Sequence, residues 1–188
     1  VFCGSSVGTQ RAYRDAAEAL GAVLADRGID LVYGGGNVGL MGVIADAVMA
    51  RRGHVIGVIP QSLANREVAH TDITELRVVD SMHTRKAMMA ELADAFIAMP
   101  GGVGTFEEFF EVVTWTQLGL HRKPCGLLNV GGFYTPLAAF IDQAVTEGFI
   151  KPVHRAAIVV DSDPARLLDT LATIELPTVP KWIDRSET

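Results

Sequence analysis

The chain has 188 residues, of which 49% are hydrophobic and 20% are charged, and its formal net charge is −6. This length and composition predict one soluble globular domain with a full hydrophobic core. The apolar runs are shorter than the roughly 18 residues that a membrane span needs, so we expect a cytoplasmic protein with no membrane partner. The acidic balance, without a basic block, argues against nucleic-acid binding.

Neither the cysteines nor the histidines indicate a metal site. Cys3 and Cys125 lie in apolar, strand-like runs without metal-type spacing, which predicts two buried thiols in a reducing compartment. The five histidines form no ligand cluster in the sequence. We therefore expect no metal and no cofactor. No secretory signal is visible, and because Val1 already lies in a strand-like run, we expect a few residues to precede it.

Short apolar runs alternate with longer amphipathic segments along the chain, which is typical of βα units in a parallel sheet covered by helices. The expected strands are residues 1–4, 30–33, 54–59, 76–79, 95–99, 125–130 and 157–160. The expected helices are residues 11–27, 40–52, 81–93, 105–119, 136–147 and 164–173. The prolines after Thr135 and Asp163 mark two of the helix starts.

This order predicts one doubly wound, Rossmann-like α/β domain with a roughly seven-stranded parallel sheet. The domain is expected to span residues 1–176, and the Pro-containing tail, residues 177–188, is expected to be loosely ordered or packed on a partner. In such sheets, ligands bind outside the carboxyl ends of the strands. Two glycine-rich loops follow expected strands at that edge.

The first glycine loop, residues 34–42, is Gly34-Gly35-Gly36-Asn37-Val38-Gly39-Leu40-Met41-Gly42. Gly34, Gly36 and Gly39 satisfy G-x-G-x-x-G, but a dinucleotide site also expects an acidic residue at the end of the next strand. That strand ends in Ile59-Pro60-Gln61 instead, which argues against NAD or FAD. Tight turns needed only for close helix–strand packing are the alternative to a phosphate site.

Arg85 interrupts the apolar stripe that Met82, Met89 and Leu92 form on the helix expected at 81–93. An inward guanidinium needs a phosphate or a carboxylate partner, unless it extends from the edge of the stripe to solvent. Lys86 either adds a second positive charge at the same place or is a solvated surface lysine.

The second glycine loop lies in Pro100-Gly101-Gly102-Val103-Gly104-Thr105-Phe106-Glu107-Glu108, between an apolar strand and a helix. Glycines let backbone amides approach an anion, and the start of a helix favours negative charge, so this turn predicts a phosphate site. Glu108 is either a functional carboxylate or the last member of a capping box that begins at Thr105.

The helix after this loop is apolar on nearly every side, since Phe106, Phe109, Phe110, Trp115 and Leu118 all belong to it. Such a helix is buried all round. Either a partner subunit or neighbouring helices of the same chain must cover it.

Together these motifs resemble the signature set of the LOG (Lonely Guy) family of cytokinin riboside 5′-monophosphate phosphoribohydrolases. The likeness runs from Phe2-Cys3-Gly4-Ser5-Ser6, through the three motifs and the segment 115–121, to the helix after Tyr134. It implies hydrolysis of the N-glycosidic bond of an N6-substituted adenosine 5′-monophosphate to the free base and ribose 5-phosphate. It also implies a homodimer.

The resemblance implies that Arg85 and Glu108 are the catalytic pair. It also implies a substrate-binding set made of Gly34, Gly35, Gly36, Gly39, Met41, Glu67, Met82, Lys86, Gly101, Gly102, Val103, Gly104 and Thr105. A carboxylate can stabilise an oxocarbenium-like sugar and activate water, and we expect the helix start and Arg85 to keep Glu108 ionised. Lys86 and the amides of residues 101–105 are expected to hold the 5′-phosphate.

Three other functions stay open on the sequence. The family has carried the label lysine decarboxylase, which requires pyridoxal phosphate on a lysine, and Lys86 is the lysine that lies in a motif. A non-catalytic nucleotide or molybdenum-cofactor carrier would keep the glycine loops without needing Glu108. Hydrolysis of AMP or another nucleotide would use the same residues on a different substrate.

Overall fold

The computed structural model describes residues 1–64 and 68–176. Its strands are all paired in parallel and form two three-stranded sheets, in the orders β1-β2-β3 and β4-β5-β6. The strands are β1 Leu31–Tyr33, β2 Val55–Pro60, β3 Glu75–Val79, β4 Phe96–Ala98, β5 Cys125–Leu128 and β6 Ile158–Asp161. The parallel α/β prediction is confirmed, but the single seven-stranded sheet is wrong for the described residues.

The segment expected to be the first strand lies between the two sheets. The Val1 amino group donates to the Val32 carbonyl of β1, whereas Phe2 forms one parallel bridge with Ala98 of β4. Beyond this bridge the Gly4 amide bonds to the Pro100 carbonyl, which already lies past the end of β4. Phe2 donates to the Ile97 carbonyl and accepts from the Met99 amide, so the pairing with β4 is one bridge long, and the Val1 amino group provides the link to β1.

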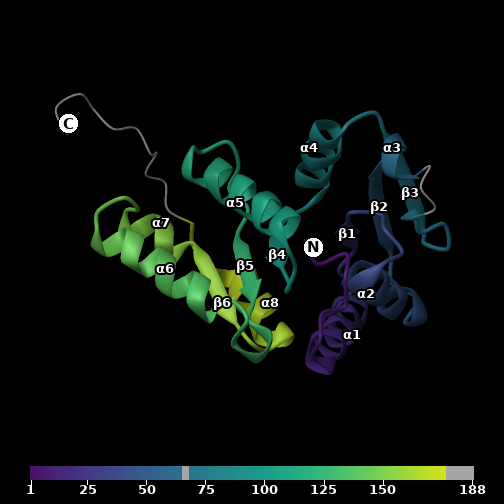
Figure 1. The fold of residues 1–188 in the computed structure, drawn as a ribbon, viewed down its shortest axis with the longest axis horizontal. Helices are drawn as coiled ribbons and strands as arrows, with labels where there is room; N and C mark the ends of the chain where they lie inside the picture. The colour runs from purple at the N-terminus through teal and green to yellow at the C-terminus, as the bar shows by residue number, and fades with distance from the viewer. Residues whose placement is uncertain (65–67, 177–188) are drawn as a thin grey trace.

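All six expected helices are present, and they cover both faces of the sheets (Figure 1). They are α1 Arg11–Asp26, α2 Gly39–Ala50, α4 Met82–Leu92, α5 Val103–Gln117, α6 Thr135–Thr146 and α8 Pro164–Thr173. Asp163 caps α8 as expected, by accepting from the Arg166 amide, but α6 begins at Thr135 itself, with Tyr134 as its cap. The short helices α3 Gln61–Leu63 and α7 Pro152–Ala156 and the 3-10 turn η2 Val130–Gly132 are too brief to show periodicity in the sequence.

The core has two parts because alternate strand residues point to opposite faces. In β1, Leu31 and Tyr33 join the core that α1, α2 and α8 cover, whereas Val32 joins the core that α4, α5 and α6 cover. Within the described ranges, no helix is both long and apolar enough to span a membrane.

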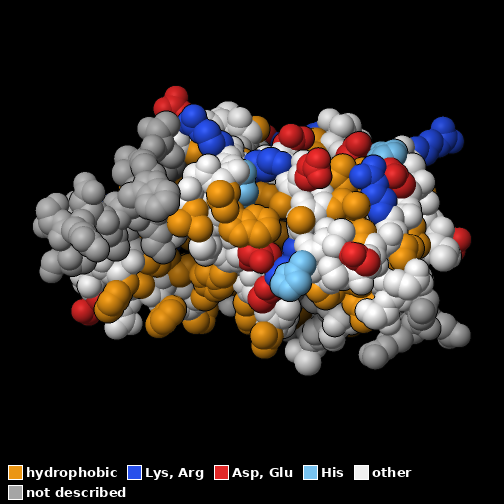
Figure 2. Space-filling view, turned by 90° about the horizontal axis from the view of Figure 1, so that it is seen from above, with side chains coloured by type: hydrophobic (Ala, Val, Ile, Leu, Met, Phe, Trp, Pro, Cys, Tyr) orange, Lys and Arg blue, Asp and Glu red, His pale blue; other side chains and the backbone are white. Residues whose placement is uncertain are grey.

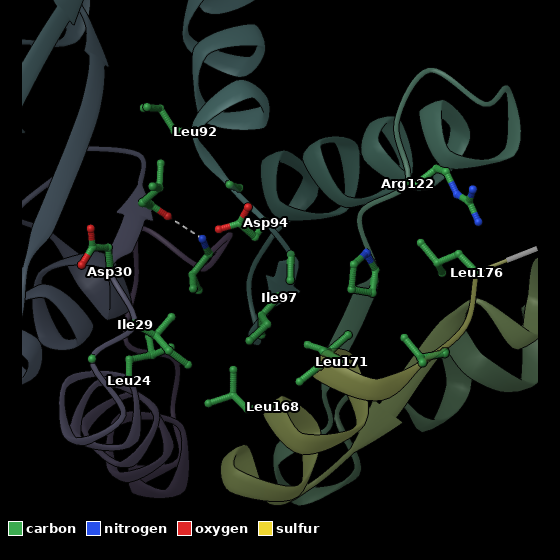
Figure 3. Close-up of a pocket in the computed structure, with 18 of the residues that line it drawn as sticks. Leu24, Ile29, Asp30, Leu92, Asp94, Ile97, Arg122, Leu168, Leu171 and Leu176 are labelled. Carbon is green, nitrogen blue, oxygen red and sulfur yellow. Dashed lines mark hydrogen bonds between the residues drawn. The ribbon is translucent and has the colours of Figure 1, made fainter.

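A groove of about 1310 Å³ opens at the amino end of the strands, between the two sheets. Its lining includes Asp30 and Asp94, which precede β1 and β4, and Leu168 and Leu171 of α8 (Figure 3). The glycine loops lie at the other end of the same strands. This groove and the predicted site therefore lie at opposite edges of the sheets.

Candidate active site

The first glycine loop makes room for Arg85. A Cβ on Gly34 would lie 2.0 Å from Arg85 Nη2 and 3.4 Å from Met41 Sδ, and one on Gly36 would lie 2.8 Å from Met41 Cε. Glycine at position 34 thus lets the guanidinium approach the end of β1 closely. The structure brings Gly34, Met41 and Arg85 together.

The rest of this loop is held by backbone contacts. Gly39 has a φ of +62°, and a Cβ there would lie 2.2 Å from the Ser5 carbonyl carbon. The Gly35 carbonyl accepts from the His70 amide, and the Asn37 amide donates to the Val68 carbonyl. The tight-turn interpretation is therefore correct for part of the loop. Glu67, which the resemblance placed in the site, lies outside the described residues.

Arg85 is buried on α4, with 8% of its surface exposed. Ser81 caps this helix by accepting from the Thr84 amide at 3.1 Å. Within residues 1–64 and 68–176, the Arg85 Nε is buried without a hydrogen-bond partner. The guanidinium does not extend to solvent, and an unpaired buried donor is what a ligand oxygen would satisfy.

Glu108 faces Arg85 from α5. Its Oε1 lies 3.4 Å from Arg85 Nη2, and both side chains are nine-tenths buried. Since α5 begins at Val103 with Gly102 as its cap, Glu108 lies in the second turn and the capping-box alternative is wrong. At 3.4 Å the two groups form an ion pair that is too long for a strong hydrogen bond.

Burial controls the ionisation of Glu108. It raises the pKa of this carboxyl above the ordinary value of 4.5, and the charge of Arg85 opposes the rise only in part. Arg85 favours the ionised form of Glu108, but desolvation has the larger effect on the pKa, and Glu108 lies beyond the first turn of α5, where the helix start acts most strongly.

The second glycine loop, residues 100–105, is open. A Cβ on Gly101 would meet Thr105 Oγ1 at 2.2 Å, whereas nothing lies within 4 Å of a Cβ on Gly102 or Gly104. Thr105 is buried and Val103 is 82% exposed. The start of this 15-residue helix therefore has open space beside Gly102 and Gly104, and the unpaired amides of a helix start favour an anion.

Lys86 is placed differently from the expectation. Its Nζ donates to Glu107 Oε1 at 2.6 Å and to Glu111 Oε1 at 3.0 Å, both on α5. Glu107 and Glu111 were missed on the sequence, although their spacing of four residues puts them on one helix face. Met82 lies one turn before Arg85, and its Sδ is 3.7 Å from Arg85 Nη1.

Gly4 connects the two loops and was also missed as a site residue. Its carbonyl accepts from the Leu40 amide at 3.0 Å, and its amide donates to the Pro100 carbonyl at 3.1 Å. A Cβ on Gly4 would lie 3.0 Å from the Ser6 carbonyl oxygen and 3.2 Å from Gly101 Cα. The signal for this position was the Phe2–Ser6 part of the family likeness.

The fold defines an α/β protein with parallel sheets flanked by helices, and the candidate site lies at the carboxyl edge of the strands. Solved structures support this class. The chain is similar to a molybdenum cofactor binding protein from Rippkaea orientalis, with a TM-score of 0.68 and 20% identity over 91% of this chain and 93% of that one. A molybdenum cofactor carrier protein from Chlamydomonas reinhardtii gives a TM-score of 0.66 and 20% identity over 87% and 88%. At such identity the likeness concerns the fold alone.

The family is shown by closer relatives. The family model described as "Possible lysine decarboxylase" matches residues 41–171. Cytokinin riboside 5′-monophosphate phosphoribohydrolase LOG of Oryza sativa subsp. japonica is 57% identical over 168 residues, 89% of this chain and 69% of the relative. A phosphoribohydrolase of the same description from Arabidopsis thaliana is 56% identical over 171 residues, 91% of this chain and 80% of the relative. The chain belongs to the LOG family of phosphoribohydrolases.

Proposed function

We propose that the protein hydrolyses the N-glycosidic bond of N6-substituted adenosine 5′-monophosphates, and of AMP, to the free base and ribose 5-phosphate. The observation that carries the proposal is the buried Arg85–Glu108 pair, with the unpaired Arg85 Nε beside the first glycine loop. The identity of 56–57% to cytokinin riboside 5′-monophosphate phosphoribohydrolases supports the substrate class.

Glu108 and Arg85 have different roles in the proposed reaction. Cleavage of the glycosidic bond passes through an oxocarbenium-like ribose, which the Glu108 carboxylate stabilises while it accepts a proton from the attacking water. A carboxyl group whose pKa is raised by burial is a stronger base once ionised. Arg85 partly offsets the burial and contacts the ribose or the phosphate through its unpaired Nε.

The two loops are proposed to hold the nucleotide. The 5′-phosphate lies on the open start of α5, against Gly101, Gly102, Val103, Gly104 and Thr105. The nucleoside lies along the first loop, which contributes Gly34, Gly35, Gly36, Gly39 and Met41, with Met82 at the exposed rim. Glu67 remains part of the proposed set on the resemblance alone.

A homodimer is proposed from the apolar surface. The exposed hydrophobic residues include Phe110 and Leu118 of α5, Leu120 just after it, Phe140 of α6, and Phe149. Figure 2 shows hydrophobic side chains gathered on the half of the molecule that carries α5, α6 and α7.

A cytoplasmic location is supported by Cys3 and Cys125. Both are buried free thiols, and burial raises the pKa of each to about 12.

The decarboxylase function has little support in the site. A Schiff-base lysine needs a lowered pKa, whereas the carboxylates of Glu107 and Glu111 raise the pKa of Lys86. The carrier function requires no catalytic carboxylate, so it leaves the burial of Glu108 against Arg85 unexplained.

Product analysis by chromatography tests the proposal. The purified protein is incubated with N6-isopentenyl-AMP, AMP and N6-isopentenyladenosine, alongside Arg85→Ala and Glu108→Ala. We expect free base from both monophosphates, none from the riboside, and none from either variant. Absence of base from every substrate would favour the carrier function, and a Glu108→Ala variant with a near wild-type rate would remove Glu108 from the mechanism.

A further inference from the structure

Lys86 follows Arg85 in α4, but its ammonium group is occupied by α5. The Nζ donates to Glu107 at 2.6 Å and to Glu111 at 3.0 Å, and only 11% of the lysine side chain is exposed. A phosphate that approached this ammonium would place its negative charge beside two carboxylates, which repel it. The contacts of Lys86 are therefore those of a structural bridge and not those of a free phosphate ligand.

The two carboxylates depend on this lysine. Glu107 and Glu111 are four residues apart on α5, so their like charges face each other on one side of the helix and destabilise it when unpaired. Lys86 lies between them and removes the repulsion. Because Lys86 follows Arg85 and Glu107 precedes Glu108, the bridge lies next to the Arg85–Glu108 pair and joins the same two helices.

These helices rest on different sheets. Helix α4 packs chiefly on β1, β2 and β3, and α5 packs on β4 and β5. The Arg85–Glu108 pair thus spans the two halves of the molecule, at a separation of 3.4 Å. Arg85 and Glu108 must contact the substrate, so their own long contact is poorly suited to fix the distance between them. The shorter contacts of Lys86 with Glu107 and Glu111 do not involve the substrate.

We propose that Lys86, through Glu107 and Glu111, is a positioning residue that clamps α4 to α5 and sets the distance between Arg85 and Glu108. The inference deepens the proposed function, on which it rests, because it concerns the same reaction. It assigns Lys86 to alignment of the catalytic pair instead of to the phosphate.

The clamp makes a different kinetic prediction from a phosphate contact. We expect Lys86→Met, and equally Glu107→Gln combined with Glu111→Gln, to lower kcat for N6-isopentenyl-AMP about tenfold or more, with KM within about twofold. Combining all three changes should cost little more than either set alone, since one interaction is removed. Glu91→Gln, an exposed glutamate of α4, is the matched control and should keep wild-type kinetics.

Reversing the charges on both sides of the clamp tests whether activity can be rescued. Lys86→Glu should lose activity, and adding Glu107→Lys and Glu111→Lys should restore part of kcat. A raised KM at unchanged kcat in Lys86→Met, or a wild-type kcat in the double glutamine variant, would overturn the clamp and return Lys86 to the phosphate.

Thermal unfolding separates this test from the proposed function. If the wild-type protein releases no base, the proposed activity fails, yet the clamp still predicts that the Tm losses of Lys86→Met and of the double glutamine variant are not additive. Additive losses would overturn the clamp whatever the activity.

Discussion

The two glycine loops lie on either side of Gly4 at one edge of the sheets, but they differ in what surrounds their glycines. In the first loop the missing side chains are replaced by neighbours: Arg85 beside Gly34 and the Ser5 backbone beside Gly39. In the second loop Gly102 and Gly104 border free space. Gly34 and Gly39 are needed for close packing, whereas Gly102 and Gly104 leave space open, so similar motifs predict different costs when these glycines are substituted.

The largest effect is expected at Gly34. In Gly34→Ala the new Cβ overlaps Arg85 Nη2, and the flexible guanidinium moves aside at little cost in stability but out of line with Glu108. We expect kcat to fall about 100-fold while the Tm changes little. Steady-state rates and thermal unfolding of the same preparation measure both. A variant with the wild-type rate would show that this glycine does not place Arg85.

Gly39→Ala is expected to differ from Gly34→Ala, because its main effect is a large loss of stability. Alanine there must adopt a φ of +62° and meet the Ser5 backbone, which cannot move aside as a side chain can. We expect Gly39→Ala to lower the free energy of unfolding by about 2 kcal/mol or more. Urea unfolding measures the loss, and an unchanged midpoint would contradict the packing interpretation of the first loop.

The pH dependence tests the environment that the first loop and α5 create around Glu108. Because burial raises its pKa above 4.5, the folded protein holds a proton that the unfolded chain releases, so the free energy of unfolding falls as pH rises from 4.5 to the raised pKa. Glu108→Gln should lose this part of the dependence. Base release by the wild type should rise with pH over the same range. If the free energy of unfolding of the wild type increased relative to that of Glu108→Gln as pH rises, this prediction would be contradicted.

The smallest effects are expected in the second loop. Gly102→Ala should change the free energy of unfolding by no more than about 0.5 kcal/mol, since nothing lies near the added methyl group, but should raise KM for the monophosphate. Gly104→Ala, inside the first turn of α5, should stabilise the helix by about 0.5–1 kcal/mol. Equal stability losses in both loops would remove the distinction between them.

Periodicity predicted the fold at the level of single elements. The continuous apolar run of β2 and the stripes of the six long helices are local signals. The division into two sheets is not local, because it depends on how residues 1–4 pair with β1 and β4, which lie far away in the sequence. Helix α7 spans only Pro152–Ala156, which is too short to repeat a pattern.

The candidate site was predictable where one residue broke a pattern. Arg85 on an apolar stripe indicated an inward charge that needs a partner. The sequence could not choose between a capping box and an active carboxylate for Glu108, because the answer depends on α5 starting at Val103 rather than at Thr105. The partners of Lys86 depend on how α4 and α5 pack against each other, which the sequence of either helix alone does not show.

Gly4 gives the site a common reference point. Its amide donates to the Pro100 carbonyl of the second loop, and its carbonyl accepts from the Leu40 amide of the first. The spacing of the two loops is therefore set by covalent bond lengths within one residue. Gly4 therefore fixes how far apart the two loops lie, whichever side chains surround them.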